Sequence, residues 1–274
     1  MGYKQLKLDT WAYRGTHASY DKQLQVLAAD VLPYEKWTSA TGVGDYNILR
    51  NYLAYTFEKL WDEREEVQGS EKSQLIYEDT KQACFNTGLL DKHWQPVFYY
   101  CIPNNRPDLQ KWKFSGFFND YTLGKCSTML SQAIMELKRP NYFDDPAKLV
   151  FDVKLDIIPQ WKHILEDHEN FQRIPEQIRL MGEDHCRKLL EGAIKETTKR
   201  IEANYKTAVP QWYKGKIQLL VPLYLTNPNV PDLALVLSLS EDGSCYYGHT
   251  CLTIDMAYNN ARLIAKPESF WLQP

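Results

Sequence analysis

The sequence lacks the patterns that would mark a secreted, membrane-spanning or metal-stapled protein. It has six cysteines, and no two of them show the C-x-x-C spacing of zinc ribbons and redox motifs. No apolar run approaches the roughly eighteen residues of a membrane-spanning helix. The chain starts with the polar segment MGYKQLKLDT, and no apolar leader precedes its first periodic segment. We therefore expect a cytoplasmic protein with free thiols in a reducing compartment and with no membrane partner.

The sequence also lacks the short motifs of several common enzyme classes. It contains no G-x-G-x-x-G, no G-x-x-x-x-G-K-[ST], no H-E-x-x-H and no G-x-S-x-G. These absences argue against a standard dinucleotide enzyme, a P-loop ATPase, a zincin and an α/β-hydrolase. An excess of positive charge is missing as well, since the formal net charge is -3. This argues against a protein held on nucleic acid by bulk charge, although a local basic groove stays open.

Aromatic side chains, by contrast, are abundant. They make up 13% of the 274 residues, with eight Trp and eighteen Tyr. They fit either a core rich in large rings or a pocket lined with stacking faces. The chain is long enough to bury a substantial core. We expect one α+β domain over 1–274, with 1–44 as a candidate peripheral extension and with 69–73 and 139–147 as candidate linkers.

Apolar periodicity predicts helices in several segments. In 45–65, apolar residues from Leu49 to Leu60 recur at helical spacing, and Asp45 is the candidate N-cap. Further helices are expected over 20–30, over 127–137, and through most of 155–206 with Asp156 at the start.

Three aromatic and β-branched runs between residues 83 and 118 predict strands of an antiparallel sheet. They read ACFNTGLL, PVFYYCI and WKFSGFF, and clusters of Asn, Pro and Asp separate them. Gly88 and Gly116 inside these runs indicate a bulge or a close approach of another group to the backbone.

The clearest strand signal is C-terminal. Apolar residues alternate with period two in 217–225 and in 233–240, and a third strand is expected at about 246–254. Short turn-rich connections predict a three-stranded antiparallel meander at the heart of the sheet. Asp255 is then predicted to cap a helix over 256–265. The fold class is α+β, an antiparallel sheet packed with several helices.

Polar side chains gather where this meander runs into the last helix. The start of such a helix offers free backbone N–H groups to an anion. Asn259 and Arg262 are three residues apart and share a helical face, so together they could grip a phosphate and the edge of a base. His249 and Asp255 are the candidate catalytic residues, in general acid–base roles. The candidate ligand-binding residues are Asn86, Asn259, Asn260, Arg262 and Lys266. In the alternative interpretation, Asp255 only caps the helix, Asn260 is solvated and Arg262 pairs with a surface carboxylate.

Asn86 comes from a distant part of the chain. It lies inside an apolar run, where a buried polar side chain must find partners. It therefore either binds ligand or ties two strands together. We predict that Asn86 joins the C-terminal residues in one concave site for a phosphate-bearing ligand.

Two further clusters are weaker candidates. Arg106, Lys111 and Lys113 surround Trp112, and such alternation of cation and ring suits either a groove for single-stranded nucleic acid or a strand with one solvated face. His163 and Asp167 lie one helical turn apart and could bind a metal or form an acid–base pair, but no third ligand is in view and no metal site is predicted.

Four stretches resemble a bacterial family of domains of unknown function. Members of that family also occur beside LOTUS-type (OST-HTH) RNA-binding domains. The resemblance implies an RNA or nucleotide ligand by analogy, and it carries no catalytic residues over. The stretches are LRNYLAYTF (49–57), CFNTGLLD (84–91), YFDDPAKLVFD (142–152) and the C-terminal segment 220–267.

Three functions follow as hypotheses. The leading one is a nucleotide- or RNA-directed protein, with a nucleotide or single-stranded RNA as partner, in RNA processing or in recognition of a nucleotide signal. The second is a non-enzymatic module whose exposed rings dock another protein. The third is a hydrolase or transferase of a small metabolite. No cofactor can be named from the sequence.

Overall fold

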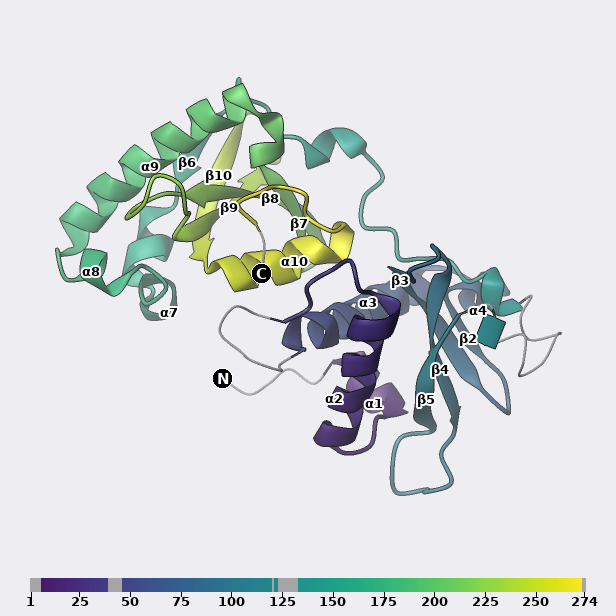
Figure 1. The fold of residues 1–274 in the computed structure, drawn as a ribbon. Helices are drawn as coiled ribbons and strands as arrows, with labels where there is room; N and C mark the ends of the chain where they lie inside the picture. Colours follow the sequence, from purple (N-terminus) through teal and green to yellow (C-terminus); the bar gives the residue numbers. More distant parts are fainter. Residues whose placement is uncertain (1–5, 39–45, 120, 123–132, 273–274) are drawn as a thin grey trace. The chain divides into compact units, whose positions relative to one another are not determined.

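The computed structural model describes residues 6–38, 46–119, 121–122 and 133–272. The chain divides into two compact units, Met1–Asn141 and Tyr142–Pro274 (Figure 1). The boundary falls inside 139–147, one of the two linkers expected from the sequence. That the units act as one domain stays a prediction. Among the described residues, no helix is both long and apolar enough to cross a membrane.

The N-terminal unit is built on a five-stranded sheet. Its three central strands pair antiparallel, as the aromatic runs predicted, and strand β1 adds to one edge in parallel, so the sheet is mixed. The ladder shifts register beside Gly88, whose φ is 74°. This confirms the expected bulge. The strands in sheet order are β1 (Ala12–Tyr13), β5 (Trp112–Phe118), β4 (Pro96–Pro103), β3 (Ala83–Leu90) and β2 (Ile76–Glu78).

A long helix, α3 (Asn47–Glu66), supplies the apolar face that packs on this sheet. Phe57 on α3 lies 4.9 Å from Phe85 on β3, and Phe85 stacks on Tyr99 of β4 at 4.8 Å. Rings therefore form much of this core, as the composition suggested. The predicted helix over 45–65 is confirmed, while its proposed cap Asp45 lies outside the described residues. Further helices of this unit are α1 (Lys7–Trp11), α2 (His17–Val26), the π-helix η1 (Leu27–Val31) and α4 (Glu71–Leu75).

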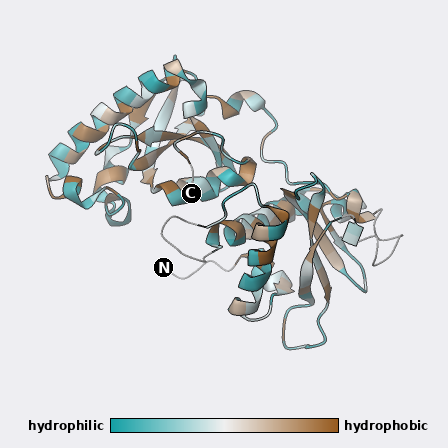
Figure 2. Ribbon diagram, viewed as in Figure 1, coloured by the Kyte–Doolittle hydropathy of each residue, from teal (hydrophilic) through white to brown (hydrophobic). Residues whose placement is uncertain are grey.

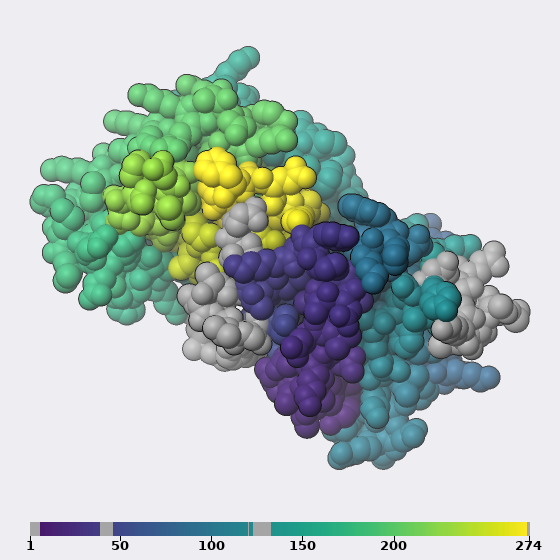
Figure 3. Space-filling model, in the orientation of Figure 1, coloured from purple at the N-terminus to yellow at the C-terminus, as the bar shows by residue number. Residues whose placement is uncertain are grey.

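Part of the segment 1–44, expected as a candidate peripheral extension, packs within this unit. Leu8, Trp11 and Ala12 are buried, and Ala12 pairs with Trp112 on β5. In Figure 3 the purple N-terminal segment lies against the blue and teal residues of the same unit. Most of the helix expected over 127–137 falls outside the described residues.

The C-terminal unit is built on a second mixed sheet. The predicted meander is confirmed and occupies its centre. Strand β6 adds to β10 in parallel, so the sheet is not purely antiparallel. Asp156 was expected to start a helix, and this was wrong: Asp156 begins β6, because Ile157 and Ile158 find a partner strand in β10. The strands in sheet order are β6 (Asp156–Pro159), β10 (Cys245–Leu252), β9 (Leu233–Leu239), β8 (Lys216–Leu223) and β7 (Val209–Tyr213).

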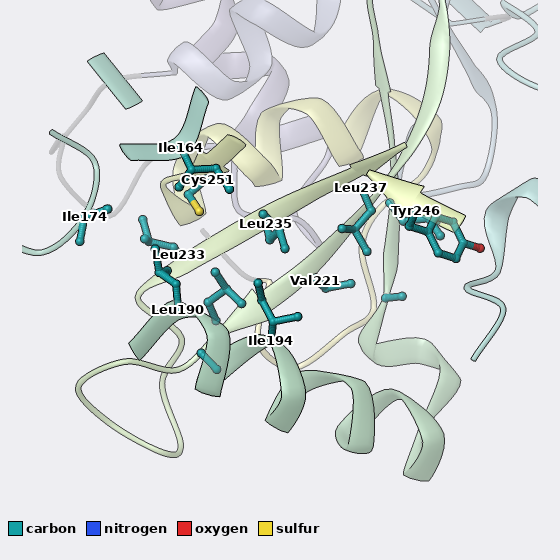
Figure 4. Close-up of a cluster of buried hydrophobic side chains, with 14 of the residues drawn as sticks. Ile164, Ile174, Leu190, Ile194, Val221, Leu233, Leu235, Leu237, Tyr246 and Cys251 are labelled. Carbon is teal, nitrogen blue, oxygen red and sulfur yellow. The ribbon is translucent and has the colours of Figure 1, made fainter. Parts of the chain in front are cut away.

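One face of this sheet packs on helix α9 (Glu183–Ala203). Leu190 and Ile194 on α9 meet Val221, Leu235 and other buried residues of the strands (Figure 4). Residues of high hydropathy are concentrated in the strands of both units (Figure 2). The other helices are η2 (Pro146–Leu149), the π-helix η3 (Lys162–Glu166), α7 (His168–Phe171), α8 (Glu176–Arg179), η4 (Tyr205–Thr207) and α10 (Ile254–Ile264).

The cap of α10 differs from the predicted one. Thr253 is the N-cap, and its side chain accepts a hydrogen bond from the backbone N–H of Met256. Asp255 lies in the first turn of the helix instead. There its carboxylate still interacts favourably with the helix dipole.

Candidate functional site

Six of the seven residues predicted to form a site lie in the C-terminal unit. His249 is on β10, Asp255 to Arg262 are on α10, and Lys266 follows that helix. Asn86 lies on β3 in the N-terminal unit. The convergence of all seven on one concave site stays a prediction.

The polar residues of α10 contact the chain itself. Nδ2 of Asn259 donates to the backbone oxygen of Asp255 at 2.9 Å. Nδ2 of Asn260 donates to Oε1 of Gln211 at 3.1 Å, and Gln211 donates in turn to Gln218. Asn260 therefore belongs to a row of amides that crosses the sheet, and it is not simply solvated. Arg262 is a buried charged residue with 9% of its surface exposed.

Asn86 is held at both ends of its amide. Its Nδ2 donates to the backbone oxygen of Leu137 at 3.0 Å, and its Oδ1 accepts from the backbone N–H of Gly88 at 2.9 Å. The side chain is buried. These contacts tie β3 to the segment at Leu137, which is not a strand, and whether Asn86 also binds a ligand stays a prediction.

Two residues of a second predicted cluster line a pocket. The pocket encloses about 490 Å³ in the N-terminal unit, and Lys111 and Trp112, which the basic-aromatic pattern singled out, form part of its wall. Lys113 is exposed, and Arg106 pairs with Asp108 at 3.0 Å. The residues lining the pocket are Lys7, Thr10, Trp11, Trp61, Glu78, Lys111 and Trp112.

Four elements bring these residues together. Helix α1 supplies Lys7 and Trp11, α3 supplies Trp61, β2 ends at Glu78, and Trp112 begins β5. The pairing of β1 with β5 sets Ala12 beside Trp112 and so places α1 at this edge of the sheet. Trp61 extends the apolar face of α3 by one turn beyond Phe57, and the two rings lie 5.8 Å apart.

Glu78 holds two of the tryptophan rings that line the pocket in place. Its Oε1 accepts hydrogen bonds from the indole N–H groups of Trp11 at 3.0 Å and Trp112 at 2.7 Å. Its Oε2 lies 2.8 Å from Nη2 of Arg64. Burial raises the pKa of Glu78, but the hydrogen bonds from both indoles and from Arg64 outweigh burial, so the pKa lies below its ordinary value. The carboxylate is therefore ionised at neutral pH and locks both indoles.

Cations surround the rings. Nζ of Lys111 lies 4.6 Å from the ring centre of Trp112, and Nζ of Lys7 lies 5.9 Å from that of Trp61. Lys7 also pairs with Asp62 at 2.6 Å. Lys111 is exposed and forms no ion pair within the described part of the chain. The pocket thus combines an indole that is only partly buried, Trp61, with an ammonium group available to an anion.

The sequence pattern identified two of the seven residues that line this pocket. Lys111 and Trp112 are adjacent in the chain and visible as a pattern. Trp11, Trp61 and Glu78 come from distant segments, and only the folded sheet brings them to the same edge. Trp11 and Trp112 are almost fully buried, at 7% and 1% exposed. Neither residue therefore stands out in the sequence as an exposed ring that could line a pocket.

His249 lies elsewhere, on β10, and is half-buried. Burial lowers its pKa, and the nearby charges of His163 and Lys216 lower it further. No group of three His, Cys, Asp or Glu side chains in the described ranges is arranged to hold a metal ion. The five cysteines that the structure describes are buried and carry free thiols.

Fold and pocket define an α+β protein of two mixed-sheet units, the first with a tryptophan-lined pocket. The chain belongs to the family described as a domain of unknown function (DUF3825), whose model matches residues 27–271 and so reaches into both units. Searches of curated proteins and of solved structures gave no match. The family description names no activity, so the function must be inferred from the site.

Proposed function

We propose that this protein binds a nucleotide unit of single-stranded RNA in the tryptophan pocket of its N-terminal unit. The observation that carries the proposal is that Trp61 and Lys111 line the same pocket of about 490 Å³. A base can stack on an indole face, and an ammonium group beside it can take the adjoining phosphate. A volume of this size is within the range of small-ligand sites.

Two of the rings that line the pocket, Trp11 and Trp112, are held in place before a ligand binds. Because Glu78 holds both Trp11 and Trp112 by their N–H groups, a ligand does not need to order these rings when it binds. The net charge of -3 limits non-specific attraction to a polyanion, so binding depends on this local arrangement rather than on bulk charge.

An RNA ligand is favoured over other flat molecules by the resemblance to domains that occur beside LOTUS-type domains. Binding of this kind would serve RNA processing or the recognition of a nucleotide signal in the cytoplasm. The five buried thiols are compatible with a reducing compartment.

Tryptophan fluorescence tests the proposal. An oligo(A) or oligo(U) strand should quench the emission saturably, and Trp61→Ala should weaken the affinity about ten-fold, since stacking of one base on a ring contributes roughly 1–3 kcal/mol. Trp94→Ala is the matched control, because Trp94 is 78% exposed and lies outside the pocket.

The same titration separates two ligand sources. AMP and UMP in place of the strand show whether a free nucleotide suffices. If neither a strand nor a mononucleotide quenches the wild-type protein, or if both tryptophan variants bind alike, the nucleotide proposal fails and the interaction-module hypothesis gains.

A further inference from the structure

A second polar cluster lies at the end of β10 in the C-terminal unit, and Arg173 is at its centre. Nη1 of Arg173 donates to Oδ1 of Asn170 at 2.8 Å, to the backbone oxygen of Cys251 at 3.1 Å and to Oγ1 of Thr250 at 3.2 Å. Three acceptors on one nitrogen fix the plane of the guanidinium group. Nε and Nη2 of Arg173 make no hydrogen bond to the described residues, so they remain donors without a protein acceptor.

A bulge lies at His249, the residue before Thr250 of this cluster. The β9–β10 ladder shifts register between Gly248 and Thr250, which makes His249 the inserted residue. Bulges commonly re-aim a side chain near a functional site. The aromatic rings of His249 and Tyr247 lie 6.3 Å apart.

The parallel edge strand brings a second imidazole to the same place. Gly248 pairs with Pro159 at the end of β6, and the backbone N–H of Gln160 donates to the oxygen of Gly248 at 2.8 Å. The chain then turns directly into η3, which carries His163. A Coulombic interaction with His163 helps to lower the pKa of His249, so the two rings are electrostatic neighbours.

Asn170 determines which nitrogen of His163 carries a proton. Oδ1 of this buried amide accepts from Arg173 and also from Oγ1 of Thr250, at 2.8 Å each. Nδ2 is therefore the donor, and it points at Nε2 of His163 at 3.3 Å. When the ring is neutral, Nε2 accepts and the proton resides on Nδ1. Nδ1 of His163 is then the N–H donor of the neutral ring.

The charge of Arg173 is not balanced within the cluster. Among the described residues, no carboxylate lies within ion-pair distance of Arg173, which is half-buried. A partly buried guanidinium group without a counter-ion is costly unless an anion or water satisfies it. The remaining donors of Arg173 form the planar fork that suits a phosphate oxygen pair.

We infer that Arg173, His163 and His249 form a binding site for a tetrahedral oxyanion, namely phosphate or the phosphate group of an ester. Arg173 binds two oxygens through Nε and Nη2, and the imidazoles donate to the others. Asn170 and Thr250 position the guanidinium group and His163. The site lies in the C-terminal unit, shares no residue with the tryptophan pocket and does not rest on the function proposed for that pocket.

Inorganic phosphate is the first probe, titrated into the full chain at fixed pH and at an ionic strength held constant with chloride. The imidazole NMR signals of His163 and His249 should shift saturably. The signals of His185, which is exposed on α9, should stay in place. A shift that is equal at all three histidines, or no saturable shift, would overturn the inference. Uridine 3′-monophosphate and inorganic sulfate as further probes distinguish an ester from a free oxyanion.

Variants test the individual roles. Arg173→Lys keeps the charge but loses the fork, and it should weaken phosphate binding about ten-fold, since each charged hydrogen bond is worth a sizeable factor in affinity. Arg179→Ala is the matched control, because Arg179 is also half-buried and donates to Ile174 and Gln172. If Arg173→Lys fails to fold, His163→Gln answers the question, because the His163 side chain is exposed. Unchanged phosphate affinity in folded Arg173→Lys or in His163→Gln contradicts the assignment.

Discussion

The indole N–H groups of Trp11 and Trp112 share a single acceptor, Oε1 of Glu78, at 3.0 and 2.7 Å. The two tryptophans come from distant parts of the N-terminal unit's sequence, and their ring centres lie 6.5 Å apart. One carboxylate oxygen therefore joins α1 to the first residue of β5. The same contact links the two elements at this edge of the sheet and holds two rings that line the pocket.

Glu78→Ala should destabilise the N-terminal unit by about 2–4 kcal/mol, since a buried donor left without an acceptor costs roughly 1–3 kcal/mol and two indoles are affected. Glu78→Gln should cost less, because an amide oxygen can still accept from the indoles. Urea unfolding followed by tryptophan fluorescence measures both. Glu66→Gln, at the exposed end of α3, is the control and should leave the midpoint unchanged.

The depressed pKa of Glu78 also predicts a pH dependence. A carboxyl group whose pKa is lower in the folded state stabilises the fold above its unfolded value, ordinarily 4.5, and loses this contribution as the pH falls through the folded-state pKa. The stability gap between the wild type and Glu78→Gln should therefore be widest near neutral pH and should close in acid. A gap that does not change with pH would contradict the assignment.

Period-two alternation was sufficient to find the meander, because β8 and β9 bury alternate residues on the face that α9 covers. The same reasoning missed β6 and β7. Both are short edge strands, and each exists because a neighbour offers backbone partners, which no local pattern records. Asp156 was assigned to a helix for this reason.

The candidate sites show the same division between residues that a local pattern reveals and residues that only the folded chain brings together. Lys111 and Trp112 are sequence neighbours, and their pattern indicated a groove. Their pocket partners Trp61 and Glu78 depend on long-range packing. Arg173 escaped notice altogether, since its environment arises from a bulge on β10 and from the return of the chain after β6.

Leu235→Asp should unfold the C-terminal unit or nearly so. Leu235 is fully buried among the residues of Figure 4, and the substitution would bury an unpaired charge. Leu239→Asp on the same strand is the control, because Leu239 is 45% exposed and its replacement leaves the charge in water. Thermal unfolding should show a large loss for the first variant and little change for the second. Equal melting temperatures would contradict the burial of Leu235.

Gly88→Ala should destabilise the N-terminal unit more than Gly69→Ala. Both glycines have positive φ, 74° and 62°, so both substitutions carry the backbone penalty of about 1–2 kcal/mol for an L-residue. A Cβ at Gly88 would also lie 2.9 Å from the hydroxyl of Tyr52, whereas nothing lies within 4 Å at Gly69. That hydroxyl donates to the backbone oxygen of Thr87 at 2.9 Å and cannot move without losing the bond. Equal losses of stability in the two variants would show that the Tyr52 side chain moves aside at no cost in free energy.

The salt dependence of RNA binding distinguishes the cation of the pocket from its ring. If Lys111 contacts one phosphate of a single strand, Lys111→Ala should reduce the slope of log affinity against log salt by about 0.7, because one fewer counterion is released. Lys113→Ala is the control, since Lys113 is exposed two residues further along the chain but does not line the pocket. Trp61→Ala should lower the affinity at every salt concentration and leave the slope unchanged, because stacking releases no counterion. A slope that falls equally in both lysine variants would mean that the strand is held by diffuse surface charge, and the tryptophan pocket would then not be where its phosphate lies.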